Sequence, residues 1–165
     1  MRTIVSQGII VCAGFLIGPM AIQSIESKDV SEVKSDPRYI VLNEFLTERD
    51  CPIARHTADF IIAADRNDLD WRLLPSISII ESGGGKDYRN NNVLGWDSCR
   101  TRFPSIQEGI HLVASHLANS KLYRHKPLED ILHTYNAANP NYAVKVKQVM
   151  RSISPVEHPI RLVPN

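Results

Sequence analysis

The spacing of apolar residues along the chain becomes helical after residue 36. Residues 25–36 have almost no periodic apolar signal, which is typical of a flexible leader. Beyond them apolar residues recur every three or four positions, the period of a helix that buries one face. The pattern predicts helices over residues 37–48, 52–66, 71–82, 105–120, 127–136 and 140–153. Residues 154–165, which contain three prolines, are predicted to form a C-terminal tail.

Residues typical of helix ends flank several of these segments. Asp70 and Asn139 are placed to cap the third and the sixth helix. Ser105 and Glu108 have the spacing of a capping box at the start of the fourth. Gly83 to Gly85 follow the third helix, where glycine can adopt the left-handed conformation that ends a helix.

The segment between the third and the fourth predicted helix lacks helical periodicity, and only a short piece around residues 93–103 is compatible with a strand. We therefore expect a mainly α fold. Residues 37–153 would form one helical domain with a short irregular or β insertion between two of its helices.

An apolar run of 15 residues, from Gly8 to Ile22, lies near the N-terminus, and Arg2 is the only charged residue before Glu26. The run is short for a membrane span but matches the apolar region of a secretory signal. We expect residues 1–24 to be a signal peptide and the protein to be secreted or periplasmic, with no stable membrane span after cleavage. An uncleaved N-terminal anchor is the alternative, and it too would export the rest of the chain.

Export affects the interpretation of the cysteines. Cys12 would be removed with the signal, which leaves only Cys51 and Cys99. An oxidising compartment favours a disulfide between these two residues, and closing a loop of that length would stabilise the fold by about 4 kcal/mol. Two reduced, buried thiols are the alternative.

The chain has 165 residues, of which 43% are hydrophobic and 22% charged, as expected for one globular domain with extra segments. Its net charge of +1 does not suggest a nucleic-acid partner. The charges are unevenly distributed, because residues 25–81 contain seven Lys or Arg against twelve Asp or Glu, and residues 82–165 contain eleven against six. The mildly basic C-terminal half would suit an anionic polymer, or is simply a solvated surface.

Glu81 ends the apolar third helix, in the stretch IIESGGGK. Ile77, Leu74 and Leu73 precede it by four, seven and eight positions, so Glu81 continues the apolar stripe and should be partly buried. The last turn also presents unpaired carbonyls, which cost a carboxylate about 0.3 to 1 kcal/mol. Both effects favour the protonated acid, the form that a general acid requires. A frayed helix end with Glu81 in water is the alternative.

Four blocks follow one another between residues 70 and 153. They are LLPSISIIESGGGK, NNNVLGW, FPSIQEGIHLVASHL and NPNYAVKV. In this order they resemble the successive motifs of the bacterial glucosaminidase family, peptidoglycan-cleaving glycosidases of the lysozyme-like superfamily. The resemblance implies a lysozyme-like helical fold with a groove for peptidoglycan glycan strands.

The first two blocks supply most of the candidate site. By the resemblance, Glu81 falls on the family's catalytic acid. Asn92, Leu94 and Gly95 fall on its Asn-Asn-x-Phe-Gly element, with leucine here in place of phenylalanine, and we expect Asn92 and Leu94 to bind substrate. Trp96 could stack on a sugar ring, or it could be a buried core residue.

The C-terminal part of the chain supplies three further candidates. Tyr142 falls on the tyrosine of the family's Asp-Pro-x-Tyr motif, in which Asn139 replaces the aspartate. Tyr135 and Asn136 are similar to the Tyr-Asn pair of lytic transglycosylases, the sister family. The resemblance implies that Tyr135 acts in catalysis and that Asn136 and Tyr142 contact substrate in a cleft near Glu81.

A second carboxylate is less evident. Family members often have one in a hairpin of the insertion, and here Asp97 is the sole candidate, since Glu108 has a capping role. Glu81 alone could protonate the glycosidic oxygen and then act as base toward water or the muramoyl 6-hydroxyl, with assistance from the substrate's acetamido group.

The expected function is a glycoside hydrolase that cleaves β-1,4 bonds of N-acetylglucosamine/N-acetylmuramic acid strands. A lytic transglycosylase that forms 1,6-anhydro ends and a non-catalytic cell-wall-binding protein are the alternatives.

Other motifs give no competing site. The six histidines lack the spacing of metal ligands, so we expect no metal site. We also expect no cofactor, and we expect the protein to be a monomer. His116 lies on an amphipathic segment and is expected at the surface. Tyr123 and Arg124 are candidates for the groove rim.

Overall fold

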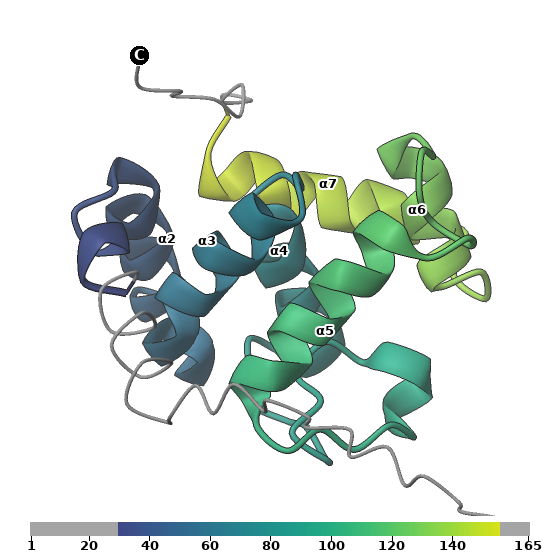
Figure 1. Cartoon of the computed structure of the whole chain (residues 1–165), viewed down its shortest axis with the longest axis horizontal. Helices are drawn as coiled ribbons and strands as arrows, with labels where there is room; N and C mark the ends of the chain where they lie inside the picture. Colours follow the sequence, from purple (N-terminus) through teal and green to yellow (C-terminus); the bar gives the residue numbers. More distant parts are fainter. Residues whose placement is uncertain (1–29, 156–165) are drawn as a thin grey trace, which may run out of the picture.

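Helices make up the fold of residues 30–155, the part of the chain that the computed structural model describes (Figure 1). The α-helices are α2 (Pro37–Thr47), α3 (Thr57–Arg66), α4 (Leu73–Ser82), α5 (Ile106–Asn119), α6 (Leu128–Tyr135) and α7 (Tyr142–Ile153), and two short 3-10 helices are η1 (Pro52–His56) and η2 (Trp96–Cys99). No strand occurs within residues 30–155. The mainly α prediction is confirmed, and the insertion between α4 and α5 is irregular, without β structure.

The predicted helix over residues 52–66 is divided into η1 and α3. Pro52 has no amide proton, and the amide of Ile53 donates to the carbonyl of Gly84 in the loop after α4, at 3.1 Å. The first turn of this segment is therefore hydrogen-bonded to a distant loop, and the regular α-helix begins only at Thr57.

The predicted helix ends are mostly correct. Ser105 caps α5, because its side chain accepts from the amide of Glu108. Gly83 ends α4 with a φ of 62°, in the left-handed region. The capping residues of α4 and α7 are Arg72 and Asn141, each two positions after the residue that the sequence suggested.

α4 is the central helix of the domain, packed against α3 and α7, while α3 also packs against α5 (Figure 1). Every residue from Leu73 to Ser78 is buried, and the surrounding helices contribute apolar side chains such as Phe60, Ile110 and Val146. Burial of each such side chain is worth about 1.5 to 3 kcal/mol. Because the N-terminal part of α4 is enclosed, its C-terminal turn is the part that reaches the surface.

The ends of the chain lie mostly outside the described residues. The predicted signal peptide does so entirely, as does most of the predicted tail. Of the predicted leader, residues 30–33 are helical, and Asp36 caps α2 by accepting from the amide of Arg38 at 2.8 Å. No helix within residues 30–155 is both long enough and apolar enough to cross a membrane.

The predicted disulfide is absent, because Cys51 and Cys99 are both free thiols. Cys51 is buried beneath the glycine turn after α4, where its Sγ lies 3.8 Å from the carbonyl oxygen of Arg49. Burial raises the pKa of this thiol, which makes it less reactive. Cys99 ends η2 and lies near Tyr135. The two thiols therefore have different surroundings, and the prediction of a Cys51–Cys99 bridge is wrong for this structure.

Candidate functional site

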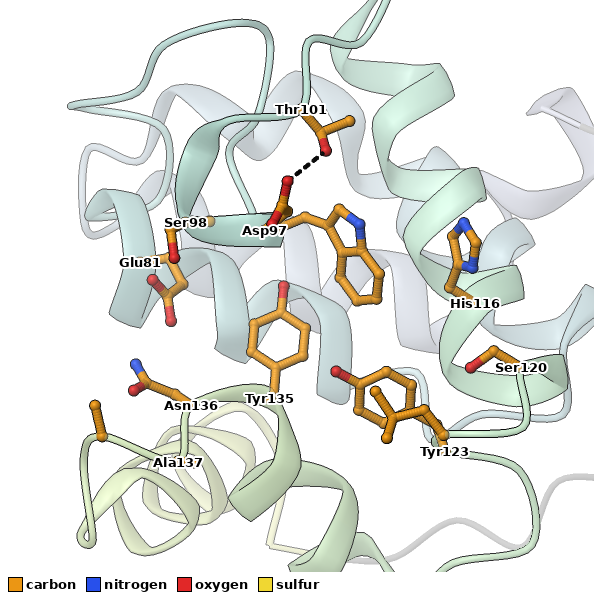
Figure 2. A pocket seen from close by; sticks show the side chains of 14 residues that line it. Glu81, Asp97, Ser98, Thr101, His116, Ser120, Tyr123, Tyr135, Asn136 and Ala137 are labelled. Atoms are coloured by element: carbon orange, nitrogen blue, oxygen red, sulfur yellow. Dashed lines mark hydrogen bonds between the residues drawn. The ribbon is translucent and has the colours of Figure 1, made fainter.

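A pocket of about 670 Å³ opens at the C-terminal end of α4 (Figure 2). Its lining comes from four parts of the chain: the end of α4, the insertion, the end of α5 with the turn that follows, and the end of α6. The lining residues are Glu81, Gly95, Trp96, Asp97, Ser98, Thr101, His116, Ser120, Leu122, Tyr123, Tyr135, Asn136, Ala137 and Ala138.

The pocket brings together five of the eight predicted site residues, namely Glu81, Trp96, Asp97, Tyr135 and Asn136. The other three, Asn92, Leu94 and Tyr142, are buried, with exposed fractions of 1%, 1% and 0%. Their side chains do not line the pocket, so the prediction that they contact substrate is corrected. They support the residues that do line it.

Glu81 lies in the last turn of α4 and is partly exposed, as its position on the apolar stripe predicted. Its carboxylate packs against the backbone of Gly95, where an added Cβ would lie 2.4 Å from Oε2. Gly95 has a φ of 69°, which a residue with a side chain rarely adopts. Gly95 therefore both allows the turn of the insertion and leaves space for the acid. It is a site residue that the set of candidates omitted, although it belongs to a motif that the resemblance used.

Asn92 holds the insertion in shape. Its Nδ2 donates to the carbonyl oxygens of Trp96 at 2.8 Å and Thr101 at 3.2 Å, and its Oδ1 accepts from the amide of Trp96 at 2.9 Å. A buried amide that is satisfied by backbone in this way has no group left for a ligand. The role of Asn92 is to fix the loop that presents Trp96.

Tyr135 joins α6 to the same loop. Its hydroxyl donates to the carbonyl oxygen of Leu94 at 2.6 Å. Burial and then the charge of Glu81 raise the pKa of Tyr135 well above its ordinary value, so the hydroxyl keeps its proton. Because that proton is used in the bond to Leu94, the geometry supports a positioning role for Tyr135 and not the predicted catalytic one.

Tyr142 lies behind Tyr135, and the two rings are stacked with centroids 5.9 Å apart and planes at 7°. The Tyr142 hydroxyl is buried and makes no hydrogen bond of full geometry, but it lies beside the Glu81 carboxylate. Burial, then the charge of Glu81 and hydrogen bonding to its carboxylate, raise the pKa of Tyr142. Tyr142 thus forms part of the interior against which the acid lies.

Trp96 is the centre of an aromatic cluster that we define as Trp96, His116, Tyr123 and Tyr135. The indole stacks on His116 at 5.3 Å and 17°, meets Tyr135 edge-on at 5.7 Å, and lies tilted by 47° to Tyr123 at 6.0 Å. Trp96 is partly buried, so it both packs on the core and lines the pocket. His116 is exposed, as expected, but its part in the pocket was not predicted, because its contact with Trp96 depends on how the insertion folds over α5.

Asp97 is at the outer edge of the pocket. Its carboxylate is 2.5 Å from Nη2 of Arg100 and accepts from Oγ1 of Thr101 at 3.3 Å (Figure 2). Asp97, Ser98 and Cys99 all have positive φ, between 51° and 59°, which costs roughly 1 to 2 kcal/mol per residue. The predicted second carboxylate therefore lines the pocket, but its oxygens are engaged by neighbours within the insertion.

Replacing Tyr135 by phenylalanine should lower the free energy of unfolding by about 1 to 3 kcal/mol, because the carbonyl of Leu94 would lose its partner. Tyr142 to phenylalanine is the matched control, since it removes a buried hydroxyl that bonds no backbone group of the insertion. Urea denaturation of both variants measures the difference. Equal stabilities for the two would show that the Tyr135–Leu94 bond does not hold the insertion.

Alkaline pH should destabilise the protein through three tyrosines, of which Tyr123 and Tyr142 are buried and Tyr135 is partly buried. Burial raises the pKa of Tyr123, Tyr135 and Tyr142 above the ordinary value near 10. Above about pH 10 the folded chain then binds more protons than the unfolded chain, so their contribution to stability is complete below pH 10 and decreases above it. Denaturation between about pH 8 and pH 11 measures the decrease, and tyrosinate absorbance should show at most two of the five tyrosines ionising before unfolding. Ionisation of a third in the folded state would contradict this.

The chemistry available in the pocket is that of one unpaired carboxylate beside aromatic rings. Glu81 forms no ion pair with any residue between 30 and 155, whereas Asp97 does. Within the same residues no three His, Cys, Asp or Glu side chains are grouped so that they could hold a metal ion. Comparisons with protein-family models, with curated proteins and with solved structures found no match to this chain.

Proposed function

We propose that this protein is an exported glycosidase that cleaves β-1,4 bonds in the N-acetylglucosamine/N-acetylmuramic acid strands of peptidoglycan, with Glu81 as the general acid. The observation that supports this most is the position of Glu81. It is a partly buried, unpaired carboxylate that lines a pocket together with aromatic rings. Rings of this kind commonly pack on the apolar faces of ligands, and a general acid must lie within reach of the leaving oxygen.

In the proposed mechanism the strand lies along the pocket, with a sugar ring against Trp96 and the scissile oxygen at Glu81. Glu81 donates its proton to that oxygen as the bond to the sugar carbon breaks. The developing positive charge at the sugar carbon is met by the substrate's own acetamido oxygen. Glu81, now a carboxylate, then takes a proton from the incoming hydroxyl. A lysozyme-like arrangement of the helices around the central α4 is part of this proposal.

The hydrogen bonds and ion pair of Asp97 help to distinguish a mechanism with two carboxylates from one with a single carboxylate. A two-carboxylate mechanism needs a second free oxygen facing the sugar, but the Asp97 oxygens are engaged by Arg100 and Thr101. This favours chemistry with one carboxylate, either hydrolysis assisted by the acetamido group or attack by the muramoyl 6-hydroxyl. The second case is that of a lytic transglycosylase, and we retain it as the alternative.

The test is incubation of the purified protein with peptidoglycan sacculi, followed by mass spectrometry of the soluble fragments. Release of glycan fragments with new sugar ends supports the proposal. Fragments one water lighter than the hydrolytic products identify the transglycosylase. If the protein binds the sacculi and releases nothing, the glycosidase proposal fails and a wall-binding protein remains.

A further inference from the structure

The turn between α5 and α6 presents three exposed cations. Lys121, Arg124 and Lys126 belong to the stretch KLYRHK, which we call the basic turn (residues 121–126). None of the three forms an ion pair with a described residue, while in the next helix Glu129 pairs with Lys147. The basic turn is therefore a local excess of positive charge.

Backbone hydrogen bonds fix the shape of the basic turn. The amides of Tyr123 and Arg124 both donate to the carbonyl of Ser120, at 3.1 and 2.9 Å, and the amide of Lys126 donates to Tyr123 at 3.2 Å. The ring of Tyr123 is buried and packs against Trp96. The cations thus belong to a turn whose backbone position is set by hydrogen bonds and by the aromatic cluster.

The basic turn borders one end of the pocket. Leu122 and Tyr123 line it directly. Figure 2 shows Ser120 and Tyr123 on the side opposite Glu81, with Tyr135 between them. A ligand that extends along the pocket from Glu81 therefore leaves it beside the cations.

The charges of the two ends differ in sign. Glu81, which has no cationic partner among the described residues, lies at one end, and Tyr123 of the basic turn lines the other. A chain of neutral sugars would have no partner for three unpaired cations, whereas a strand that bears carboxylates on its substituents would place them there. Charges on a rim of this kind attract and orient an oppositely charged ligand.

We propose that the basic turn binds the carboxylates of the peptide stems attached to the glycan strand, so that the site prefers stem-bearing strands to uncharged ones. This inference depends on the proposed function for the identity of the strand. It goes further by naming the substituent that the pocket recognises and the residues that recognise it.

The inference is tested by binding measurements on the full chain. Every protein in the comparison contains Glu81→Gln, so that the probes are bound but not cleaved. Two probes are compared, a peptidoglycan tetrasaccharide that bears peptide stems and an N-acetylglucosamine tetramer of equal length. Adding K121Q, R124Q and K126Q should weaken binding of the stem-bearing probe about tenfold, because the substitutions remove three exposed charge pairs whose small contributions add. The same substitutions should change binding of the uncharged probe less than about twofold. Raising the salt concentration should reduce the difference, because it screens exposed charges.

The matched control removes three other exposed cations, Arg55 of η1 and Lys145 and Arg151 of α7, two helices that contribute no residue to the pocket. It changes the net charge by the same amount and should leave both affinities unchanged. Equal weakening by the control, or equal weakening of the two probes, would overturn the inference. So would a similar loss for a sulfated polysaccharide, because the turn would then be a general polyanion surface. If the wild-type chain cleaves nothing but still shows the stem preference, only the glycosidase proposal fails.

Discussion

Replacing Glu81 by glutamine is expected to reduce the cleavage of peptidoglycan by about 10² to 10⁴-fold. Glutamine keeps the size and the hydrogen-bonding shape of the side chain, but it cannot give a proton to the glycosidic oxygen. Glu81 makes no ion pair with a described residue, so the free energy of unfolding should change by less than about 0.5 kcal/mol. The rate of fragment release from sacculi and the midpoint of urea denaturation measure the two quantities on the same preparation.

Glu108→Gln provides the control for this substitution. Glu108 is an exposed carboxylate in the first turn of α5 and does not line the pocket, so its loss should leave the rate unchanged.

Asp97→Asn tests whether the second carboxylate takes part in cleavage. Its oxygens are bonded to Arg100 and Thr101, and a loss of rate well below that of Glu81→Gln is expected. Full activity of Glu81→Gln would show that Glu81 is not the general acid. If wild type and variant release fragments from sacculi equally slowly and both still bind the sacculi, the protein is a wall-binding protein.

The helices and the place of the acid could be predicted from the sequence because both depend on local spacing. Apolar residues at every third or fourth position determine which face of α4 is buried, and Glu81 continues that face. The glycines after it are compatible with a helix end whatever the rest of the fold does. Partial exposure of Glu81 at the end of α4 follows from these features alone.

The insertion could not be predicted in the same way, because its shape depends on contacts between distant residues. The bond from Tyr135 to Leu94 joins residues that are 41 positions apart. The left-handed conformation continues from Asp97 into Ser98 and Cys99, which do not favour it, so local preference does not predict this turn. For this reason the burial of Asn92 and the separate surroundings of the two cysteines became evident only in the structure.

Replacing Gly95 by alanine should reduce cleavage about 10- to 100-fold through its effect on Glu81. The new Cβ would lie 2.4 Å from Oε2 and 2.8 Å from Cδ of Glu81, so the carboxylate must move. A shift of about 1 Å in a catalytic group can cost on the order of 10²-fold in rate. Because the φ of Gly95 is 69°, alanine should also lower the free energy of unfolding by roughly 1 to 2 kcal/mol.

Gly83→Ala separates the two effects of the Gly95 substitution. Gly83 has a similar φ of 62°, but the nearest atom to its added Cβ is Cβ of Lys86 at 3.6 Å, an ordinary contact. This variant should therefore lose stability to the same extent and keep its rate, when both are measured at a temperature well below unfolding. A rate loss in Gly83→Ala as large as that in Gly95→Ala would attribute the effect to backbone strain. Wild-type activity in Gly95→Ala would mean that the observed position of the Glu81 carboxylate is not the one that catalysis requires.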